Sequence, residues 1–309
     1  MERENFYLPP QKSIKANSGN WYKNIGYIGK GGNGTTFLVM CTDGENRGQI
    51  FALKVLHQVS STQRIDRFMQ EIDFLKGNRH PCILQHFDNG VYLDHPFLVM
   101  TYIPHTLGDE LKKGIPFGHG VIYATQLLSA LAYLHSKNVI HRDIKPQNIF
   151  INNCNAILGD FGLIKKLEED QSDDDEFKAI CNAKIETKED FNGYIAMPQY
   201  YRTPELVGYA KNECQLHLKS DIFQLGLVLA QVFTGKNPLL PSNDMLDAIK
   251  LNPISKINCS YGGWLASTLK KMLDMNPNKR PSAETLLDDF TGIFAKYSEK
   301  RMALDGQMF

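Results

Sequence analysis

Four polar residues that lie close together in the sequence carry side chains suited to phosphoryl chemistry. Asp143 and Lys145 are followed by Asn148, and Asp160 lies a short distance downstream. An aspartate can accept the proton of an attacking hydroxyl, a lysine can neutralise a phosphate, and amide and carboxylate oxygens suit Mg²⁺. Such a set fits transfer of a phosphoryl group from a nucleotide, a reaction catalysed mainly by positioning and charge neutralisation.

These residues belong to a longer pattern. Residues 141–148 read His-Arg-Asp-Ile-Lys-Pro-Gln-Asn, and residues 160–162 read Asp-Phe-Gly. Eight matched positions followed by Asp-Phe-Gly make a specific signal, whereas Asp-Phe-Gly alone would be weak. On these residues the chain resembles the eukaryotic-like protein kinase superfamily, serine/threonine type, over roughly residues 22–290.

The resemblance implies a role for each of the four residues. Asp143 would orient the substrate hydroxyl and act as the catalytic base, and Lys145 would neutralise the γ-phosphate of ATP. Asn148 and Asp160 would bind Mg²⁺. A lysine two positions after the aspartate marks serine/threonine rather than tyrosine specificity in this family. His141 and Phe161 resemble residues that pack the loop in place.

A glycine-rich segment precedes this region. Gly29, Gly31 and Gly34 form a G-x-G-x-x-G pattern, which alone is weak because hairpin turns and dinucleotide-binding units share it. A dinucleotide-binding unit needs a helix directly after the glycines, whereas residues 35–40 predict a strand. This order resembles the kinase loop that covers the phosphates, where missing side chains let backbone amides approach phosphate oxygens.

The following strand resembles the kinase strand that carries the phosphate-binding lysine. By this resemblance Lys54 would hold the α- and β-phosphates, and Ala52 would leave room for adenine. Glu71 lies on a predicted helix over residues 64–76 and would pair with Lys54. Taken singly, each charged residue is more often a solvated surface charge. Thr36 stands where the family usually packs a valine on adenine.

Residues 99–103 resemble the hinge between the kinase lobes. Backbone groups of Thr101 and Ile103 would bind the adenine edge, and Met100 would be the gatekeeper at the back of the pocket. A gatekeeper is also a core residue, so the two interpretations of Met100 agree.

Later residues resemble the part of the family that supports the protein substrate. Thr203-Pro204-Glu205 and residues 220–226 match family motifs, and Arg280 would pair with Glu205. Small-molecule phosphotransferases lack this region. Pro198 stands where the family carries a threonine that bonds the catalytic aspartate. Thr203, another group or a different platform would have to replace that contact.

The activation segment, residues 160–205, is long and contains an acidic run at residues 168–176. The run is typical of a disordered, solvated insertion. Arg142, directly before the catalytic aspartate, suggests that an anion orders the segment. Autophosphorylated Thr187 or Ser172 could supply this anion, and so could the unmodified acidic run.

Composition points to a cytoplasmic protein. The formal net charge is zero, which indicates no nucleic-acid partner and no membrane surface. The six cysteines lack C-x-x-C spacing, so neither a zinc site nor a disulfide framework is expected. No signal peptide is visible, and the most apolar run, residues 222–233, is too short to span a bilayer.

The order of predicted elements indicates an α+β protein with a two-lobed, protein kinase-like fold. A small antiparallel sheet with one helix would precede a larger, mainly helical lobe, with the nucleotide between them near residues 101–104. The expected parts are an N-terminal arm, an N-lobe, a C-lobe and a tail, at residues 1–20, 21–101, 102–296 and 297–309. The arm is expected to be extended or loosely packed.

The residues favour ATP- and Mg²⁺-dependent phosphorylation of serine or threonine on protein substrates, which the sequence does not identify. The alternative is a pseudokinase scaffold that binds nucleotide without phosphoryl transfer. Loss of any one residue of the catalytic set would favour the scaffold. All five are present, which argues for the enzyme: Lys54, Glu71, Asp143, Asn148 and Asp160.

Overall fold

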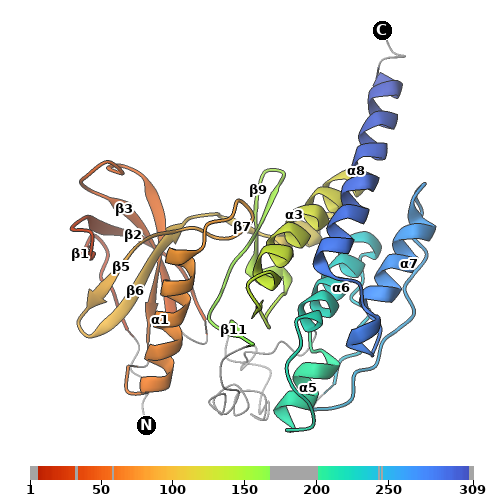
Figure 1. The fold of residues 1–309 in the computed structure, drawn as a ribbon. Coiled ribbons are helices and arrows are strands. Elements are labelled where there is room, and N and C mark those ends of the chain that lie inside the picture. The colour runs from red at the N-terminus through yellow and green to blue at the C-terminus, as the bar shows by residue number, and fades with distance from the viewer. Residues whose placement is uncertain are drawn as a thin grey trace. The chain divides into compact units, whose positions relative to one another are not determined.

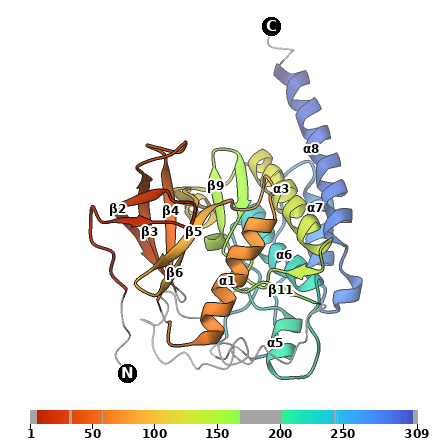
Figure 2. The same ribbon diagram turned by 60° about the vertical axis from the view of Figure 1, so that its left-hand side comes forward.

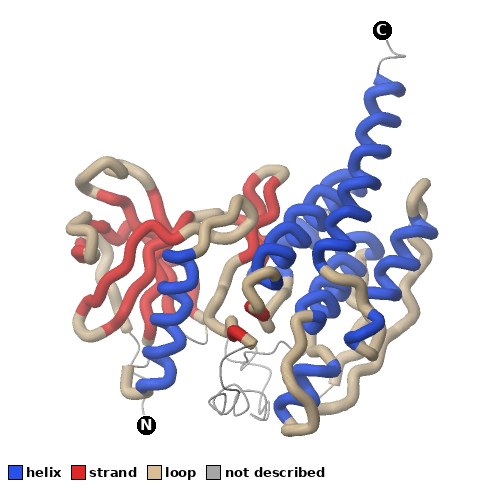
Figure 3. The backbone as a smooth tube through the Cα atoms, viewed as in Figure 1, coloured by secondary structure: helices blue, strands red, loops and turns tan. Residues whose placement is uncertain are grey.

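The computed structural model describes residues 6–31, 34–57, 59–167, 201–242, 244 and 246–305, with side chains up to residue 300. The chain divides into two compact units. The first comprises the described residues up to Ile103 together with Phe161–Leu163, and the second comprises Pro104–Asp160 and the described residues from Ile164 onward. Strands dominate the first unit and helices the second (Figure 3), which confirms the α+β expectation.

The first unit is built on a six-stranded sheet in the order β1-β2-β3-β4-β6-β5, with every neighbouring pair antiparallel. The strands are β1 (Ser13–Lys15), β2 (Trp21–Lys30), β3 (Gly34–Cys41), β4 (Ile50–Leu56), β5 (His86–Tyr92) and β6 (His95–Thr101). Register shifts between Asn24 and Gly26 and between Tyr27 and Gly29 bend β2.

The two faces of this sheet have different roles, as the alternation along β3 shows. Phe37 and Val39 are buried in a hydrophobic core with Leu53 and Phe97. Successive side chains point to opposite faces, so Thr36, which pairs with Lys54 across β3 and β4, lies on the other face. One face of the sheet therefore forms the core, and the opposite face carries the predicted phosphate-binding lysine.

The N-terminal segment differs from the expected loose arm. Leu8 and Ile14 are each 1% exposed and belong to the same core as Phe37. The Asn24 amide donates to the carbonyl oxygens of Leu8 and Pro9, at 2.8 and 3.1 Å. The apolar side chains in a polar stretch thus provide enough burial to add β1 to the sheet edge, and residues 6–20 form part of the first unit.

Helix α1 (Thr62–Gly77) packs against β5 and β6 within this unit (Figure 1). Ser61 caps it by accepting the Arg64 N–H. Its buried face includes Phe68, Glu71 and Ile72. Met69, by contrast, is 36% exposed.

The second unit is organised around α3 and α6, two long helices with many buried residues. Helix α3 packs against α8 and α6, and the C-terminal part of α8 extends beyond its neighbours (Figure 2). Its helices are α2 (Leu107–Lys113), α3 (Phe117–His135), α5 (Pro204–Ala210), α6 (Lys219–Thr234), α7 (Gly262–Met272) and α8 (Ala283–Asp305), with 3-10 turns η1 (Pro146–Asn148) and η4 (Pro277–Lys279). Residues 220–230 and Val232 of α6 are all buried, as the apolar sequence of this helix predicts.

Short strands complete the second unit and flank the predicted catalytic loop. Strands β7 (His105–Thr106), β9 (Ile149–Asn152) and β10 (Asn155–Leu158) form one sheet, and β8 (Val139–Ile140) pairs with β11 (Lys165–Lys166). Residues 141–148, hereafter the catalytic loop, run from the end of β8 to the start of β9. Across the described ranges, no helix combines the length and apolarity needed to cross a membrane.

The burial of the N-terminal segment makes a testable prediction about stability. We expect Ile14→Ala to lower the free energy of unfolding by about 2–5 kcal/mol, because it leaves a cavity in the core. Urea titration followed by circular dichroism measures this change. Ile50→Ala, at a sheet position that is 48% exposed, serves as the control and should cost at most about 1 kcal/mol. Equal effects at both positions would contradict an integral role for the segment.

Candidate functional site

The catalytic loop holds Asp143 by one of its two carboxylate oxygens. Oδ2 accepts hydrogen bonds from Lys145 Nζ at 2.9 Å and from Asn148 Nδ2 at 2.8 Å. Asn148 Nδ2 also donates to the Asp143 carbonyl oxygen at 2.9 Å. The other oxygen, Oδ1, is buried and has no hydrogen-bond partner among the described residues. The carboxylate is therefore fixed in orientation while one oxygen keeps its lone pairs.

Burial and neighbouring charges shift the pKa values of this pair. Burial raises the pKa of the Asp143 carboxyl above its usual range, and the Asp160 carboxylate raises it further, against the opposing effect of Lys145. Burial acts to lower the pKa of Lys145, but the carboxylates of Asp143 and Asp160 prevail and raise it. Lys145 therefore stays charged, and Asp143 is a stronger base than an exposed aspartate.

His141 connects the catalytic loop to the residue that precedes Asp160. Its side chain is fully buried, Nδ1 accepts from the Asp143 N–H at 3.3 Å, and Nε2 donates to the Gly159 carbonyl at 3.2 Å. The Gly159 N–H donates to the Asn148 carbonyl at 2.9 Å. Gly159 is therefore held on both sides, which places Asp160 beside the loop with a left-handed φ of 57°. The expected packing role of His141 is consistent with these contacts.

Asn148 and Asp160 can supply oxygen donors for a divalent cation. The Asn148 amide nitrogen is used within the loop, so its Oδ1 is the atom suited to a hard cation. Asp160 lies close enough to Asp143 for the two carboxylates to repel, which a cation would relieve. The described residues contain no cluster of three or more His, Cys, Asp or Glu that would form an all-protein metal site. The donors present fit a cation shared with substrate phosphates.

In the first unit, Lys54 and Glu71 form a closely paired ion pair. Lys54 Nζ donates to both Glu71 oxygens at 2.9 Å, and the side chains are 13% and 3% exposed. The ammonium group also lies 5.9 Å from the centre of the Phe68 ring. The predicted pair is present, and its burial rules out the alternative of two solvated surface charges. Phe161 is buried in the same unit and stacks on Phe74 with ring centres 5.3 Å apart.

The three glycines of the predicted phosphate loop differ in what a side chain at each position would meet. A Cβ atom at Gly34 would lie 2.3 Å from the Val55 carbonyl oxygen, so glycine is needed there for β3 to pack beside β4. Among the residues that the structure describes, a Cβ at Gly29 would meet nothing within 4 Å, and one at Gly31 would meet only the Gly34 oxygen at 4.0 Å. Packing therefore explains Gly34 but neither of the other two.

The predicted adenine-binding residues lie together at the end of the sheet. Ala52 pairs with Met100 across β4 and β6, and both are buried. The Thr101 N–H donates to the Gln85 carbonyl at 3.2 Å, so this amide is engaged within the protein. Ile103, the last residue of the first unit before the chain enters the second, is 7% exposed.

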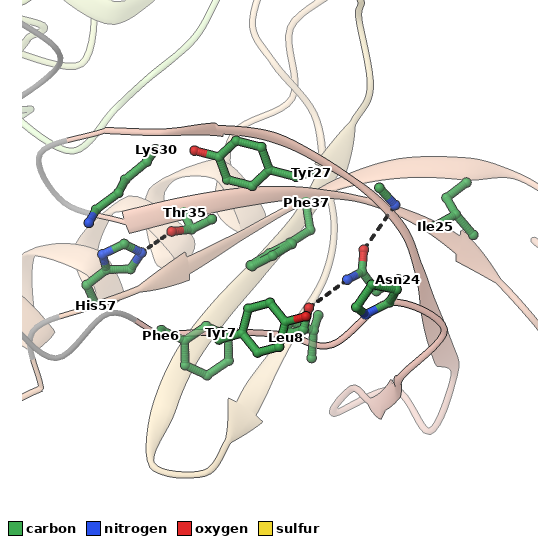
Figure 4. Close-up of a pocket in the computed structure, with 12 residues that line it drawn as sticks. Phe6, Tyr7, Leu8, Asn24, Ile25, Tyr27, Lys30, Thr35, Phe37 and His57 are labelled. Atoms are coloured by element: carbon green, nitrogen blue, oxygen red, sulfur yellow. Dashed lines mark hydrogen bonds between the residues drawn. The ribbon is translucent and has the colours of Figure 1, made fainter.

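A cavity of about 440 Å³ (Figure 4) lies on the face of the six-stranded sheet opposite to the face that carries Lys54. Thr35 and Phe37 line it, and they alternate with Thr36 along β3, so it faces away from Lys54. Thr35 Oγ1 is hydrogen-bonded to His57 Nε2. Burial lowers the pKa of His57 to about 4, with further lowering from Lys30 and His95. The cavity is therefore distinct from the predicted nucleotide-binding face.

The predicted pairing of Glu205 with Arg280 is confirmed in the second unit. The guanidinium makes two hydrogen bonds to the carboxylate, at 2.7 and 2.9 Å, and both side chains are buried. Ser220 also donates to Glu205 at 3.0 Å. The guanidinium lies 4.8 Å from the centre of the Phe223 ring, so the ion pair also packs on an aromatic side chain of α6. Thr203 Oγ1 accepts the Leu206 N–H as the cap of α5, and it does not bond Asp143.

Several expected features lie outside the described residues. They are Pro198, the acidic run at 168–176, and the candidate phosphorylation sites Ser172 and Thr187. Arg142 is described: its side chain is 2% exposed and its φ is 70°. A regulatory anion near Arg142 stays a prediction.

Comparison with known proteins agrees with these contacts. The model of the protein kinase domain matches residues 22–290. Serine/threonine-protein kinase pkn2 of Myxococcus xanthus is 29% identical over 84% of this chain, and Nek3 of Oryza sativa subsp. japonica is 28% identical over 86%. Probable serine/threonine-protein kinase nek3 of Dictyostelium discoideum is 29% identical over 86%. The chain spans 31%, 43% and 23% of the lengths of these three relatives. The chain belongs to the protein kinase family, and its similarity is to eukaryotic-like kinases of the serine/threonine type.

Proposed function

We propose that this chain transfers the γ-phosphoryl group of ATP to serine or threonine hydroxyls of protein substrates. The observation that carries the proposal is the state of Asp143: Lys145 and Asn148 hold one carboxylate oxygen, and the other is buried without a partner among the described residues. That oxygen can accept a hydroxyl proton. Family membership and the serine/threonine kinases among the relatives support the same reaction.

The reaction assigns a step to each of these groups. The substrate hydroxyl oxygen bonds to the γ-phosphorus while the bond from that phosphorus to the β–γ bridging oxygen breaks, which releases ADP. The hydroxyl proton passes to Asp143 Oδ1 late in the step. Lys145, which stays protonated, neutralises charge on the transferred phosphoryl group. Burial of Asp143 raises its pKa, which favours proton acceptance.

Nucleotide binding falls to residues of the first unit. Lys54, oriented by Glu71, would hold the α- and β-phosphates, and the amides at Gly29 and Gly31 would approach phosphate oxygens. Thr36, Ala52 and Met100 would surround adenine, with the Thr101 carbonyl and the Ile103 backbone at its edge. The open space around Gly29 and Gly31 supports this assignment, because a Cβ atom at either position would meet no atom of the described residues closer than 4.0 Å.

Asn148 and Asp160 would bind Mg²⁺, which supplies charge neutralisation and orientation of the phosphates when bound. The partners, the cellular location and the autophosphorylation sites are likewise part of the proposal. The partners would be protein substrates of unknown identity, with no nucleic acid, in the cytoplasm. Autophosphorylation would occur at Thr187 or Ser172. The non-catalytic scaffold gains no support, because Lys54 and Asp143 have the partners that catalysis requires.

The first prediction from the proposed function concerns Asp143 as the catalytic base. Asp143→Asn should lower kcat by about 10²–10⁴-fold, because the amide cannot accept the substrate proton. Transfer of labelled phosphate from ATP to a generic protein substrate measures the change. Asp73→Asn, at an exposed position of α1, is the control and should leave kcat at the level of the unmodified chain. Phosphate transfer at that level by Asp143→Asn would exclude Asp143 as the base.

The second prediction concerns pH. We expect kcat/KM to fall as the pH drops through the raised pKa of Asp143, because the protonated carboxyl cannot act as a base. Lys145→Met removes a charge that lowers this pKa, so the acidic limb should move to higher pH even though overall activity falls. The exposed Lys113→Met should leave the limb in place. An unmoved limb in Lys145→Met would argue against Asp143 as the titrating group.

The third prediction concerns the Lys54–Glu71 pair. Lys54→Met and Glu71→Gln should each lower kcat/KM for ATP, and the double variant should lose far less than the product of the two losses. Glu71 acts through Lys54, so its removal has little further effect once the lysine is gone. The more exposed pair of Glu110 and Lys113, whose charged atoms are 2.8 Å apart, provides the control cycle. Fully multiplicative losses at Lys54 and Glu71 would show that the two act independently.

A further inference from the structure

A single side chain on α6 is hydrogen-bonded to both peptide groups that flank Asp143. Gln224 Oε1 accepts the Ile144 N–H at 3.0 Å, and Nε2 donates to the Arg142 carbonyl at 3.0 Å. The same Nε2 donates to the Tyr201 carbonyl at 3.0 Å, just before α5. The Gln224 side chain is fully buried. One carboxamide therefore joins the catalytic loop to the end of the activation segment.

The backbone that Gln224 holds is strained. Arg142 has a φ of 70°, a left-handed conformation that is unfavourable for a non-glycine residue. Asp221 Oδ1 accepts the Arg142 N–H at 3.0 Å, and Gln224 takes the Arg142 carbonyl. Asp221 and Gln224 are three positions apart and so lie on one face of α6. The same helix face therefore fixes both ends of the strained residue that precedes the base.

The contacts of Gln224 complement those of the catalytic loop itself. Lys145 and Asn148 orient the Asp143 carboxylate through Oδ2, whereas Gln224 acts on the main chain before and after it. Without the carboxamide, the Arg142 carbonyl and the Ile144 N–H would each lose a buried hydrogen-bond partner, which is unfavourable for a polar group away from water. An apolar residue would pack in α6 equally well, so helix packing does not explain a glutamine here.

We infer that Gln224 is a positioning residue for phosphoryl transfer: it sets the main-chain geometry of Asp143 and ties the base to Tyr201, near the end of the activation segment. The inference rests on the proposed function for its kinetic consequence. It does not rest on that function for its structural consequence, which is protection of the Ile144 amide. The two consequences can be measured separately.

The kinetic test compares two glutamine-to-methionine variants. Gln224→Met keeps the length of the side chain and removes all three hydrogen bonds. Its single-turnover rate of phosphate transfer should fall by on the order of 10²-fold, the effect of a small misplacement of a catalytic group. Its Kd for an ATP analogue should match that of the unmodified chain, because Lys54 and Glu71 are untouched.

Gln126→Met is the matched control. Gln126, on α3, accepts the Ala156 N–H at 2.7 Å and donates to Asn155 at 3.2 Å, away from the catalytic loop. This variant also loses carboxamide hydrogen bonds, in this case to the partly buried strand β10. It should transfer phosphate at the rate of the unmodified chain.

Hydrogen–deuterium exchange provides the structural test on the same two variants, below their melting temperatures. Gln224→Met should speed exchange of the Ile144 amide and leave the Ala156 amide unchanged, and Gln126→Met should do the reverse. General loosening of the fold would speed both amides in both variants and would overturn the inference.

Each remaining outcome also decides the question. A folded Gln224→Met with unaltered rate and unaltered Ile144 exchange overturns the inference and leaves the proposed function intact. If the unmodified chain transfers no phosphate, the proposed function fails, and Ile144 exchange alone decides the role of Gln224. Gln224→Ala, which leaves room for water at the carbonyl groups, replaces the methionine variant if the latter does not fold. Failure of both to fold assigns Gln224 to stability and overturns the positioning role.

Discussion

The catalytic loop depends on hydrogen bonds from α6, because it is buried and has no ladder of its own to satisfy its backbone. Loops usually run over the surface, where water pairs their polar groups. Here His141, Arg142 and Ile144 are at most 2% exposed. Asp221 accepts the His141 and Arg142 N–H groups, and Gln224 holds the next two peptide groups. Because α6 is itself buried, these side chains have little freedom, and the loop takes its geometry from a rigid element.

Helix α6 is in turn held by the buried ion pair of Glu205 and Arg280. The guanidinium lies over Phe223, donates to the Lys219 carbonyl at 2.8 Å, and shares the Glu205 carboxylate with Ser220. Removal of one partner from a buried pair costs about 3–5 kcal/mol, since the other charge is left uncompensated. Residues 75 positions apart in the sequence therefore fix the start of the helix that fixes the catalytic loop.

Local sequence patterns predicted the functional residues better than they predicted the residues that hold the sheet and the catalytic loop in place. The loop around Asp143 and the Lys54–Glu71 pair follow from motifs whose spacing is short. The burial of Leu8 and Ile14 could not be predicted this way, because two apolar residues in a polar stretch show their value only against a sheet edge. Gln224 was visible as a polar interruption in an apolar helix, which signals a buried group that needs partners. Its partners in the catalytic loop lie about 80 positions away, so only the tertiary structure identifies them.

The two Asp143 oxygens differ in hydrogen bonding, and this difference suits catalysis rather than stability. A site selected for stability alone would pair both, because an unpaired buried acceptor costs about 1–3 kcal/mol or more. Lys145 and Asn148 both bond Oδ2, and Thr203, the nearest candidate in the sequence for a replacement contact, is used to cap α5. The second oxygen is thereby kept basic by burial and by Asp160 rather than neutralised by a donor. A buried oxygen without a donor destabilises a non-catalytic scaffold, but a catalytic base needs such an oxygen. The geometry of Asp143 itself therefore argues for an active enzyme.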